Sequence, residues 1–214
     1  AMEMSLRWAE RSAKAFGDQP GKAMFGIVQG GFHPDLRVAH ARHLRSLDLE
    51  GYAIGGLSVG EPQARMLEML DVTVPELPQD RVRYLMGVGK PDDLVGAVER
   101  GVDMFDCVLP TRNARNGQLF TSGGRINIKN ARYAEDDAPL DPQCGCYTCR
   151  HHSRAYLRHL YMAGEMSAGT LNTLHNLRFY LDTMRRIRDA IVFRTFDNFR
   201  QGFLRSTARL SLDS

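Results

Sequence analysis

The fold is decided by the stretch VRYLMGVGKPDDLV, residues 82–95. It begins with a short apolar run, Val82–Met86, which predicts a strand that ends in the glycine-bearing tip Gly87–Lys90. Pro91 then takes the first position of a helix and Asp92-Asp93 occupy its first turn, and both features favour a helix N-terminus. The stretch therefore indicates one unit of strand, loop and helix.

Similar units lie on both sides of this stretch. The predicted strands of the series are Ala23–Val28, Gly51–Ile54, Val82–Met86 and Val102–Leu109. Strands that alternate with amphipathic helices imply a parallel sheet with right-handed crossovers. Four such units make about half of an eight-stranded (β/α)8 barrel, whose usual length is about 250 residues. Because a half barrel leaves two open strand edges, we expect the missing half to lie upstream of Ala1.

Each helix is expected to bury one apolar face. The predicted inward residues are Leu36, Ala39, Leu44 and Leu47 in the helix Pro34–Leu47, Ala64, Leu67 and Leu70 in the next helix, and Met4, Trp8 and Ala15 in an N-terminal helix. The segment from Thr111 to Pro142 is polar and is expected to be irregular, with a short strand near Ile126 and Ile128. Two helical stretches are predicted after it, around Ser153–Met162 and Ser167–Phe193.

The composition is that of an ordinary globular protein. Hydrophobic residues make up 43% of the 214 residues and charged residues 25%. The formal net charge of +3, from 28 Lys and Arg against 25 Asp and Glu, permits a polyanionic partner without proving one. No run of about 18 apolar residues occurs, and the N-terminus lacks the layout of a signal peptide, so no membrane association is expected.

Three of the four cysteines are crowded into Cys144-Gly145-Cys146-Tyr147-Thr148-Cys149. Only Cys107 lies elsewhere, so distant disulfide partners are lacking, and a reduced, cytoplasmic metal site explains the cluster better. Three thiolates leave one position on a tetrahedral zinc ion. His151 and His152 are nearby, but His175 on the following helix closes the site with less strain. A full set of four ligands predicts a structural site; free surface cysteines are the alternative.

Polar groups are expected where the parallel strands end, because catalytic residues of barrels lie there. Gln29 offers an amide suited to the edge of a flat heterocycle, and Gly55 with Gly56 lets the backbone approach a ligand closely. Tyr84 and Met86 are suited to form apolar walls.

Asp106 lies at the end of the last predicted strand, among apolar neighbours. A carboxylate there is suited to attack a sugar carbon, as in retaining glycosyl transfer. The alternative is a structural aspartate that caps the next loop, and the residues alone leave both readings open. The following stretch, Thr111–Asn116, carries two arginines that are suited to phosphates or base edges. Arg185-Arg186-Ile187-Arg188 is a second basic stretch, for which a solvated helix face is the simpler explanation.

Five motifs, in this order, resemble those of the bacterial-type tRNA-guanine transglycosylase (queuine tRNA-ribosyltransferase) family. They cover nearly the whole chain and correspond to the C-terminal half of the family's proteins. Each motif is moderately specific by itself, whereas five in order are very specific. The motifs are Phe25–Gly31, Gly55–Glu61, Tyr84–Gly89, Phe105–Arg112, and the cysteine cluster with His175.

The resemblance implies a TIM barrel with an inserted zinc subdomain. It also implies an enzyme that exchanges guanine 34, at the wobble position of tRNA with a GUN anticodon, for preQ1 in queuosine biosynthesis. By resemblance Asp106 is the nucleophile that attacks the ribose C1′ and holds the tRNA covalently. The implied purine-binding residues are Gln29, Gly55, Gly56, Leu57, Tyr84 and Met86, the implied RNA-contacting residues are Gly87, Val88, Gly89, Lys90, Pro91, Asp92, Asp93, Thr111, Arg112, Asn113, Ala114 and Arg115, and the implied zinc ligands are Cys144, Cys146, Cys149 and His175.

One departure from the family pattern matters for activity. The family's general acid/base aspartate and a second purine-binding aspartate lie in the first half of the barrel, and no position here matches them. We therefore expect the chain alone to be inactive and the longer parent protein to be active. We expect barrel units over residues 1–110, an RNA-contacting and zinc-binding part over 111–180, and a C-terminal helix over 181–214.

A cytoplasmic homodimer is expected from the family. The alternatives are a non-catalytic tRNA-binding fragment or partner subunit, and an unrelated barrel enzyme with a structural zinc knuckle. The intact motif around Asp106 argues against the first, and the arginine-bearing loop in place of a phosphate-binding glycine turn argues against the second.

Overall fold

A computed structural model describes residues 2–208 of the chain, with side chains through Arg205. The chain divides into two compact units, Ala1–Cys107 and Val108–Ser214. None of the helices within the described residues combines the length and the apolar character that crossing a membrane requires.

The first unit contains a four-stranded parallel sheet in the order β1-β2-β3-β4. Along one row of the sheet, Ile27 pairs with Ala53, Ala53 with Tyr84, and Tyr84 with Met104. This topology confirms the predicted α/β class and parallel strand order, and it is consistent with part of a TIM-like barrel. The strands are Phe25–Val28 (β1), Gly51–Ile54 (β2), Val82–Leu85 (β3) and Met104–Phe105 (β4).

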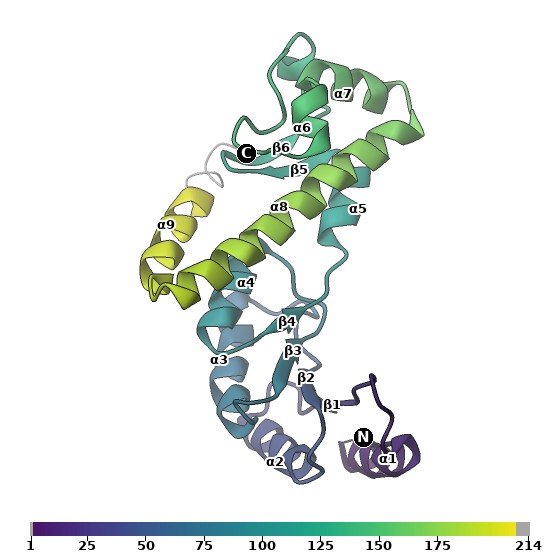
Figure 1. Cartoon of the computed structure of the whole chain (residues 1–214), viewed down its shortest axis with the longest axis vertical. Coiled ribbons are helices and arrows are strands. Elements are labelled where there is room, and N and C mark those ends of the chain that lie inside the picture. Colours follow the sequence, from purple (N-terminus) through teal and green to yellow (C-terminus); the bar gives the residue numbers. More distant parts are fainter. Residues whose placement is uncertain (1, 209–214) are drawn as a thin grey trace. The chain divides into compact units, whose positions relative to one another are not determined.

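Three helices, α2, α3 and α4, cover one side of this sheet (Figure 1). Their inner faces and the strands enclose one apolar core that includes Leu44, Ile54, Leu70 and Leu85, all fully buried. The other side of the sheet keeps apolar residues partly exposed, namely Ile27, Val82 and Met104. The helices of the unit are Met2–Phe16 (α1), Pro34–Arg45 (α2), Gln63–Thr73 (α3), the 3-10 turn Val74–Glu76 (η1) and Pro91–Glu99 (α4).

The predicted buried face was wrong for part of α2. Leu36 and Ala39 are exposed, and α2 instead turns Arg37 and His40 inward together with Ala41 and Leu44. A pattern search that places only apolar residues inside cannot find this face, because two of its members are polar. Both have backbone partners on the loops that follow β1 and β2, which offsets the cost of burying them.

The predicted faces of α3 and α1 also need correction. In α3, Leu70 is buried as predicted, but Ala64 is exposed and Met66 and Met69 fill the inner face. In α1, the residues that pack against the core are Leu6, Ala9 and Ala13, whereas Met4, Trp8 and Ala15 are exposed. The last strand is shorter than the predicted Val102–Leu109, because a helix already begins at Leu109.

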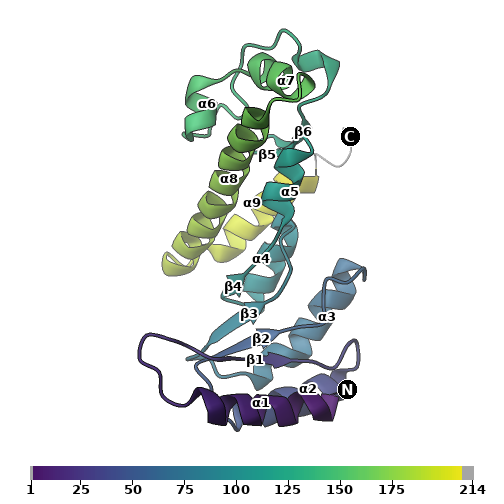
Figure 2. The same cartoon turned by 90° about the vertical axis from the view of Figure 1, so that its right-hand side faces the viewer.

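The second unit is built around one long helix, α8, which packs against α5, α6, α7 and β5 (Figure 2). The segment expected to be irregular contains a helix and an antiparallel hairpin, β5–β6. Ile126 lies in β6 as predicted, whereas Ile128 follows it. The elements are Leu109–Arg115 (α5), Gln118–Thr121 (β5), Gly124–Asn127 (β6), Ala131–Tyr133 (η2), Tyr147–His151 (α6), Arg154–Met162 (α7), Met166–Val192 (α8) and Phe196–Ala208 (α9).

Buried amides of α8 tie these elements together. The side chain of Asn176 donates to the carbonyls of Pro110 at 3.0 Å and Gln118 at 3.1 Å, and it accepts from the amide of Phe120 at 3.0 Å. A small apolar cluster that includes Leu119, Leu140 and Leu157 lies beside the cysteines. The second unit is therefore held by polar contacts as well as by apolar burial.

Candidate active site and metal centre

Asp106 follows β4 and is held by groups from β3 and the loop after it. Its Oδ1 accepts a hydrogen bond from the hydroxyl of Tyr84 at 2.6 Å and another from the amide of Gly87 at 2.8 Å. The Tyr84 bond, with that of Gly87, lowers the pKa of the Asp106 carboxyl, and the same bond raises the pKa of the Tyr84 phenol. The carboxylate is exposed and ionised at neutral pH, as a nucleophile must be.

The loops after β1 and β2 meet at the same end of the sheet. The amide of Gly55 donates to the carbonyl of Val28 at 3.0 Å, which joins the two strand ends. A Cβ on Gly55 would lie 3.0 Å from Nε2 of Gln29, and one on Gly56, where φ is +68°, would lie 3.3 Å from its Oε1. The amide of Gln29 therefore lies directly against the two glycines. Leu57, the fourth predicted purine-binding residue of this edge, is buried in the core.

Glu61 shapes the second of these loops and was not singled out from the sequence. Its carboxylate accepts hydrogen bonds from the amides of Ser58 and Val59, the latter at 2.8 Å. Burial raises the pKa of Glu61, but the amide hydrogen bonds outweigh it, and the pKa is lowered overall. Ser58 has a φ of +62°, so the loop is held in a conformation that a non-glycine residue seldom adopts.

Arg37 and His40 are two further residues that the sequence analysis missed, and both lie fully buried beneath the loops. A detectable feature of the sequence was their spacing of three, with Ala41 and Leu44 continuing the same helical face. An arginine on a core-facing stripe calls for acceptors inside the protein.

The predicted RNA-contacting stretch Gly87–Asp93 is only partly a loop. The loop ends at Lys90, which is exposed, and Pro91, Asp92 and Asp93 form the first turn of α4. The carboxylate of Asp93 is buried, accepts from Gln63 at 2.6 Å, and has a pKa raised by that burial. Val88 is buried too, and Gly89 lies so close to Cys107 that a Cβ on Gly89 would clash with the Cys107 side chain. Met86 is half-buried, and its amide donates to Ile54 at 3.2 Å.

The second predicted RNA-contacting stretch, Thr111–Arg115, was expected to be a loop and is helix α5. Arg112 and Arg115 are exposed on it, whereas Ala114 is fully buried and Asn113 donates to the side chain of Gln118 at 2.7 Å. Thr111 donates to the carbonyl of Val108.

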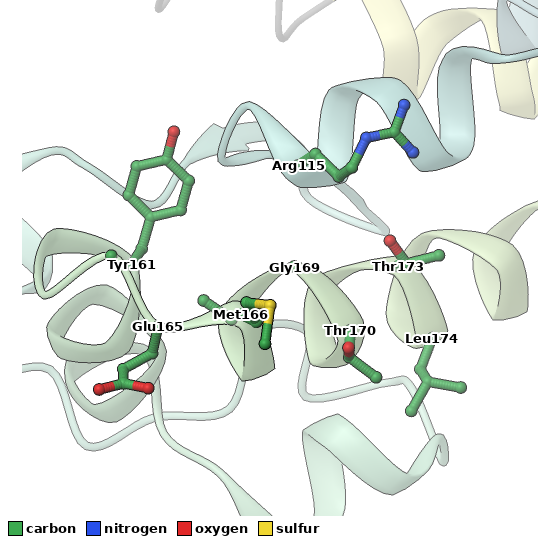
Figure 3. A pocket seen from close by; sticks show the side chains of 10 residues that line it. Arg115, Tyr161, Glu165, Met166, Gly169, Thr170, Thr173 and Leu174 are labelled. Atoms are coloured by element: carbon green, nitrogen blue, oxygen red, sulfur yellow. The ribbon is translucent and has the colours of Figure 1, made fainter.

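Arg115 also lines an open pocket of about 740 Å³ within the second unit. The other walls come from the end of α7 and the first turns of α8, including Tyr161, Met166 and Leu174 (Figure 3). The lining holds no carboxylate other than Glu165, which lies at the start of α8.

The four predicted metal ligands lie together in the second unit. The ligand atoms of Cys144, Cys146, Cys149 and His175 all lie within 4.8 Å of one another. Nδ1 of His175 is 3.2 Å from Sγ of Cys149 and 3.7 Å from Sγ of Cys146. Bond lengths of about 2.3 Å for Zn–S and about 2.0 Å for Zn–N put the ligand atoms of a tetrahedral site about 3.5 to 3.8 Å apart, so this set fits zinc.

The surroundings orient the metal ligands. Nε2 of His175 lies 2.7 Å from the carbonyl of Phe120, so Nε2 carries the proton and Nδ1 is free to bind a metal. Cys146 precedes α6 and its Sγ accepts from the amide of Cys149 at 3.4 Å. A hydrogen bond from the Cys149 thiol lowers the pKa of the Cys146 thiol, so the pair favours a thiolate at Cys146. With four protein ligands this is the arrangement of a structural site.

Comparison with known proteins agrees with this architecture. The sequence matches the family described as "Queuine tRNA-ribosyltransferase" over residues 1–209. Among curated proteins, the "Queuine tRNA-ribosyltransferase" of Agrobacterium fabrum is 57% identical over 213 residues, which are 100% of this chain and 57% of that protein. The protein of the same name from Rhizobium meliloti is 62% identical over 191 residues, covering 89% of this chain and 51% of the relative.

A third relative of that name, from Pseudomonas aeruginosa, is 57% identical over 203 residues, covering 95% of this chain and 54% of the relative. The chain thus spans about half the length of the curated relatives that it matches. Because the family match extends over nearly the whole chain, the chain belongs to the queuine tRNA-ribosyltransferase family.

Proposed function

We propose that this chain supplies the nucleophile-bearing part of a tRNA-guanine transglycosylase, a pentosyl glycosyltransferase that exchanges guanine 34 of tRNA for preQ1 in queuosine biosynthesis. The observation that carries the proposal is the ionised Asp106 at the end of β4, held through one oxygen by Tyr84 and Gly87. Family membership supports the tRNA substrate and the glycosyl transfer.

In the proposed reaction Asp106 takes the place of the departing base. A carboxylate oxygen forms a bond to the ribose C1′ while the bond from C1′ to N9 of guanine breaks, and guanine leaves with that electron pair and gains a proton. Guanine loss gives C1′ oxocarbenium character, which the negative charge of Asp106 stabilises before capture. The incoming base then attacks C1′ from its own nitrogen after losing a proton, and the Asp106 carboxylate leaves. We assign the proton transfers to a group outside this chain.

The two glycine loops and β3 form the proposed base-binding edge. Gln29 presents an amide with both donor and acceptor groups, and Gly55 and Gly56, which have no side chains, let this amide lie directly against the second loop. Tyr84 and Met86 form the neighbouring wall. The buried side chain of Leu57 supports this edge from the core, so its contribution to the base is made through the backbone.

The proposed RNA contacts are the exposed groups of the two predicted stretches. Lys90, Arg112 and Arg115 are suited to phosphates and base edges near a GUN anticodon. Further proposed RNA contacts are the amides of the Gly87–Lys90 loop in the first unit and the exposed polar groups of α5 in the second. We leave the carboxylate of Asp93 out of this set, because that group is buried against Gln63.

Zinc is the proposed ion of the four-ligand site. Cys144, Cys146, Cys149 and His175 would hold it, and its contribution is to cross-link the hairpin, α6 and α8 so that the unit keeps its shape. The domain division 1–110, 111–180 and 181–214, a cytoplasmic location with reduced thiols, and a homodimer remain proposals.

The barrel is proposed to be completed by residues outside this chain. Three exposed apolar side chains on the open side of the sheet, Ile27, Val82 and Met104, support this, because a parallel sheet is normally covered on both sides. It follows that the 214-residue chain alone should not exchange guanine. Steady exchange by the purified chain would refute that expectation.

The proposed function is tested by exchange of labelled guanine into tRNA by the natural gene product that contains this chain. Asp106→Asn should lower the rate by about 10⁴-fold or more, because it removes the nucleophile. Asp103→Asn is the matched control, since Asp103 lies three positions before Asp106 and its carboxylate accepts from the Arg83 amide instead. A zinc-loaded gene product that binds tRNA and never exchanges guanine would favour a tRNA-binding subunit.

A further inference from the structure

The geometry points to Arg37 as a positioning residue that holds the loop after β1 and the loop after β2 at a fixed spacing. These loops carry Gln29 and the Gly55-Gly56 pair, so the consequence for base binding rests on the proposed function. The spacing of the loops themselves rests on the contacts of Arg37 alone.

The Arg37 guanidinium reaches both loops from beneath. Its Nε donates to the carbonyl of Gly31 at 2.6 Å, and its Nη2 donates to the carbonyl of Gly55 at 3.0 Å and approaches that of Gly56 at 3.5 Å. One planar group thus binds the backbone of two loops that belong to different strands. Only a side chain with several donors in a fixed fork has this geometry.

The first loop also lies directly on the helix that carries Arg37. A Cβ on Gly30 would stand 2.8 Å from the Arg37 amide nitrogen and 2.9 Å from its Cγ. The adjacent His40, fully buried as well, accepts from the amide of Gln29 at 3.4 Å through Nδ1. Burial lowers the pKa of His40, so its ring is neutral near pH 7 and Nδ1 can accept. The loop that presents Gln29 is therefore set by helix α2.

A role in the core alone does not explain an arginine here. Arg37 is fully buried, and burying a cation costs far more than burying the alkyl side chains that continue this face, such as Leu44. Burial lowers the pKa of Arg37 to about 10, so the group is still charged at neutral pH. Its guanidinium donates to carbonyls of the two loops. These hydrogen bonds, together with the nearby carboxylate of Glu61, offset part of the cost of the buried charge, whereas Nη1 is buried without a hydrogen-bond partner.

Hydrogen exchange on the natural gene product that contains this chain tests the contacts directly. Arg37→Lys keeps the charge but loses the fork, and it should speed amide exchange around residues 29–31 and 55–57 by about tenfold relative to the rest of the unit. The control is Leu44→Ala, on the same helix and fully buried, which should destabilise the unit without singling out these loops. Equal loop protection in Arg37→Lys and the unchanged chain would overturn the proposal.

Kinetics on the natural gene product test the consequence for base binding. Arg37→Met should raise KM for guanine by about tenfold or more while kcat at saturation stays within about threefold, with Arg37→Lys in between. Leu44→Ala, with at least as large a loss of thermal stability, should leave KM within about twofold. A KM rise shared equally by Leu44→Ala would reduce Arg37 to a structural residue.

The two experiments distinguish failure of the proposed function from failure of the positioning role of Arg37. If the unchanged gene product exchanges no guanine, the proposed function fails, and the amide-exchange result still decides whether Arg37 sets the loops. If the unchanged protein is active and Arg37→Met has a normal KM, the proposed function stands and the positioning role is wrong.

Discussion

The two units are stabilised in different ways. Among the described residues, the core of the first unit is an apolar cluster that includes Leu44, Leu70 and Leu85, whereas the smaller cluster of the second includes two of the proposed metal ligands, Cys146 and Cys149. The second unit relies further on buried polar groups of α8 such as Asn176. Apolar burial therefore stabilises the first unit, which also carries the proposed nucleophile Asp106, whereas we expect the second unit to depend on its proposed metal ligands.

The two units also differ in net charge. Residues 1–107 carry 12 Lys and Arg against 16 Asp and Glu, whereas residues 108–214 carry 16 against 9. The modest net charge of +3 hides this difference. A basic second unit is suited to a polyanion, which agrees with the proposed contacts of Arg112 and Arg115 to tRNA.

The largest effect is expected from removing the metal, which should destabilise the second unit. Chelation, or Cys146→Ala, should abolish metal binding and the amide protection of residues 118–176, because structural zinc contributes about 10–16 kcal/mol in zinc-finger peptides. Cys107→Ala, the matched control outside the cluster, should keep one metal per chain. Metal analysis and hydrogen exchange measure both effects. Unchanged metal content in Cys146→Ala would remove Cys146 from the ligand set.

A core substitution in the first unit should destabilise that unit and leave the metal site of the second unit unchanged. Leu70→Ala removes a fully buried side chain and should lower the free energy of unfolding by about 2–5 kcal/mol, seen as faster amide exchange in residues 25–105. Metal content should stay unchanged. Loss of the metal in this variant would show that the two units do not keep separate sources of stability.

The smallest effect is expected from Tyr84→Phe, which tests whether the Tyr84 hydroxyl lowers the pKa of Asp106. The Tyr84 hydroxyl is the largest cause of the lowered pKa of Asp106, so its removal raises that pKa toward the ordinary value. A lowered pKa keeps the carboxylate ionised down to more acidic pH, and activity is lost as pH falls through it. The acid limb of the exchange rate should therefore move to higher pH, with a loss of about tenfold or less at neutral pH. An acid limb that does not move would contradict the assignment.

Local patterns predicted much of this structure. The glycines that follow the strands and Pro91 at the start of α4 predicted where these elements end and begin, because glycine and proline favour particular backbone angles. The cysteine spacing selected three ligands, and the structure brings His175, 29 residues after Cys146, to the same place. The inner face of α2 was mispredicted because the burial of Arg37 depends on backbone carbonyls of other loops, and the sequence of the helix alone does not show that these acceptors are present. Helix α5 was missed because its buried Ala114 and Pro110 depend on contacts with α8.

The role of Asp106 is tested most directly by trapping the natural gene product with tRNA, digesting it, and locating the covalent link by mass spectrometry. We expect a ribose-linked peptide that contains Asp106, absent in Asp106→Asn and retained in Asp103→Asn. A link to another residue, or rapid guanine exchange by Asp106→Asn, would contradict it.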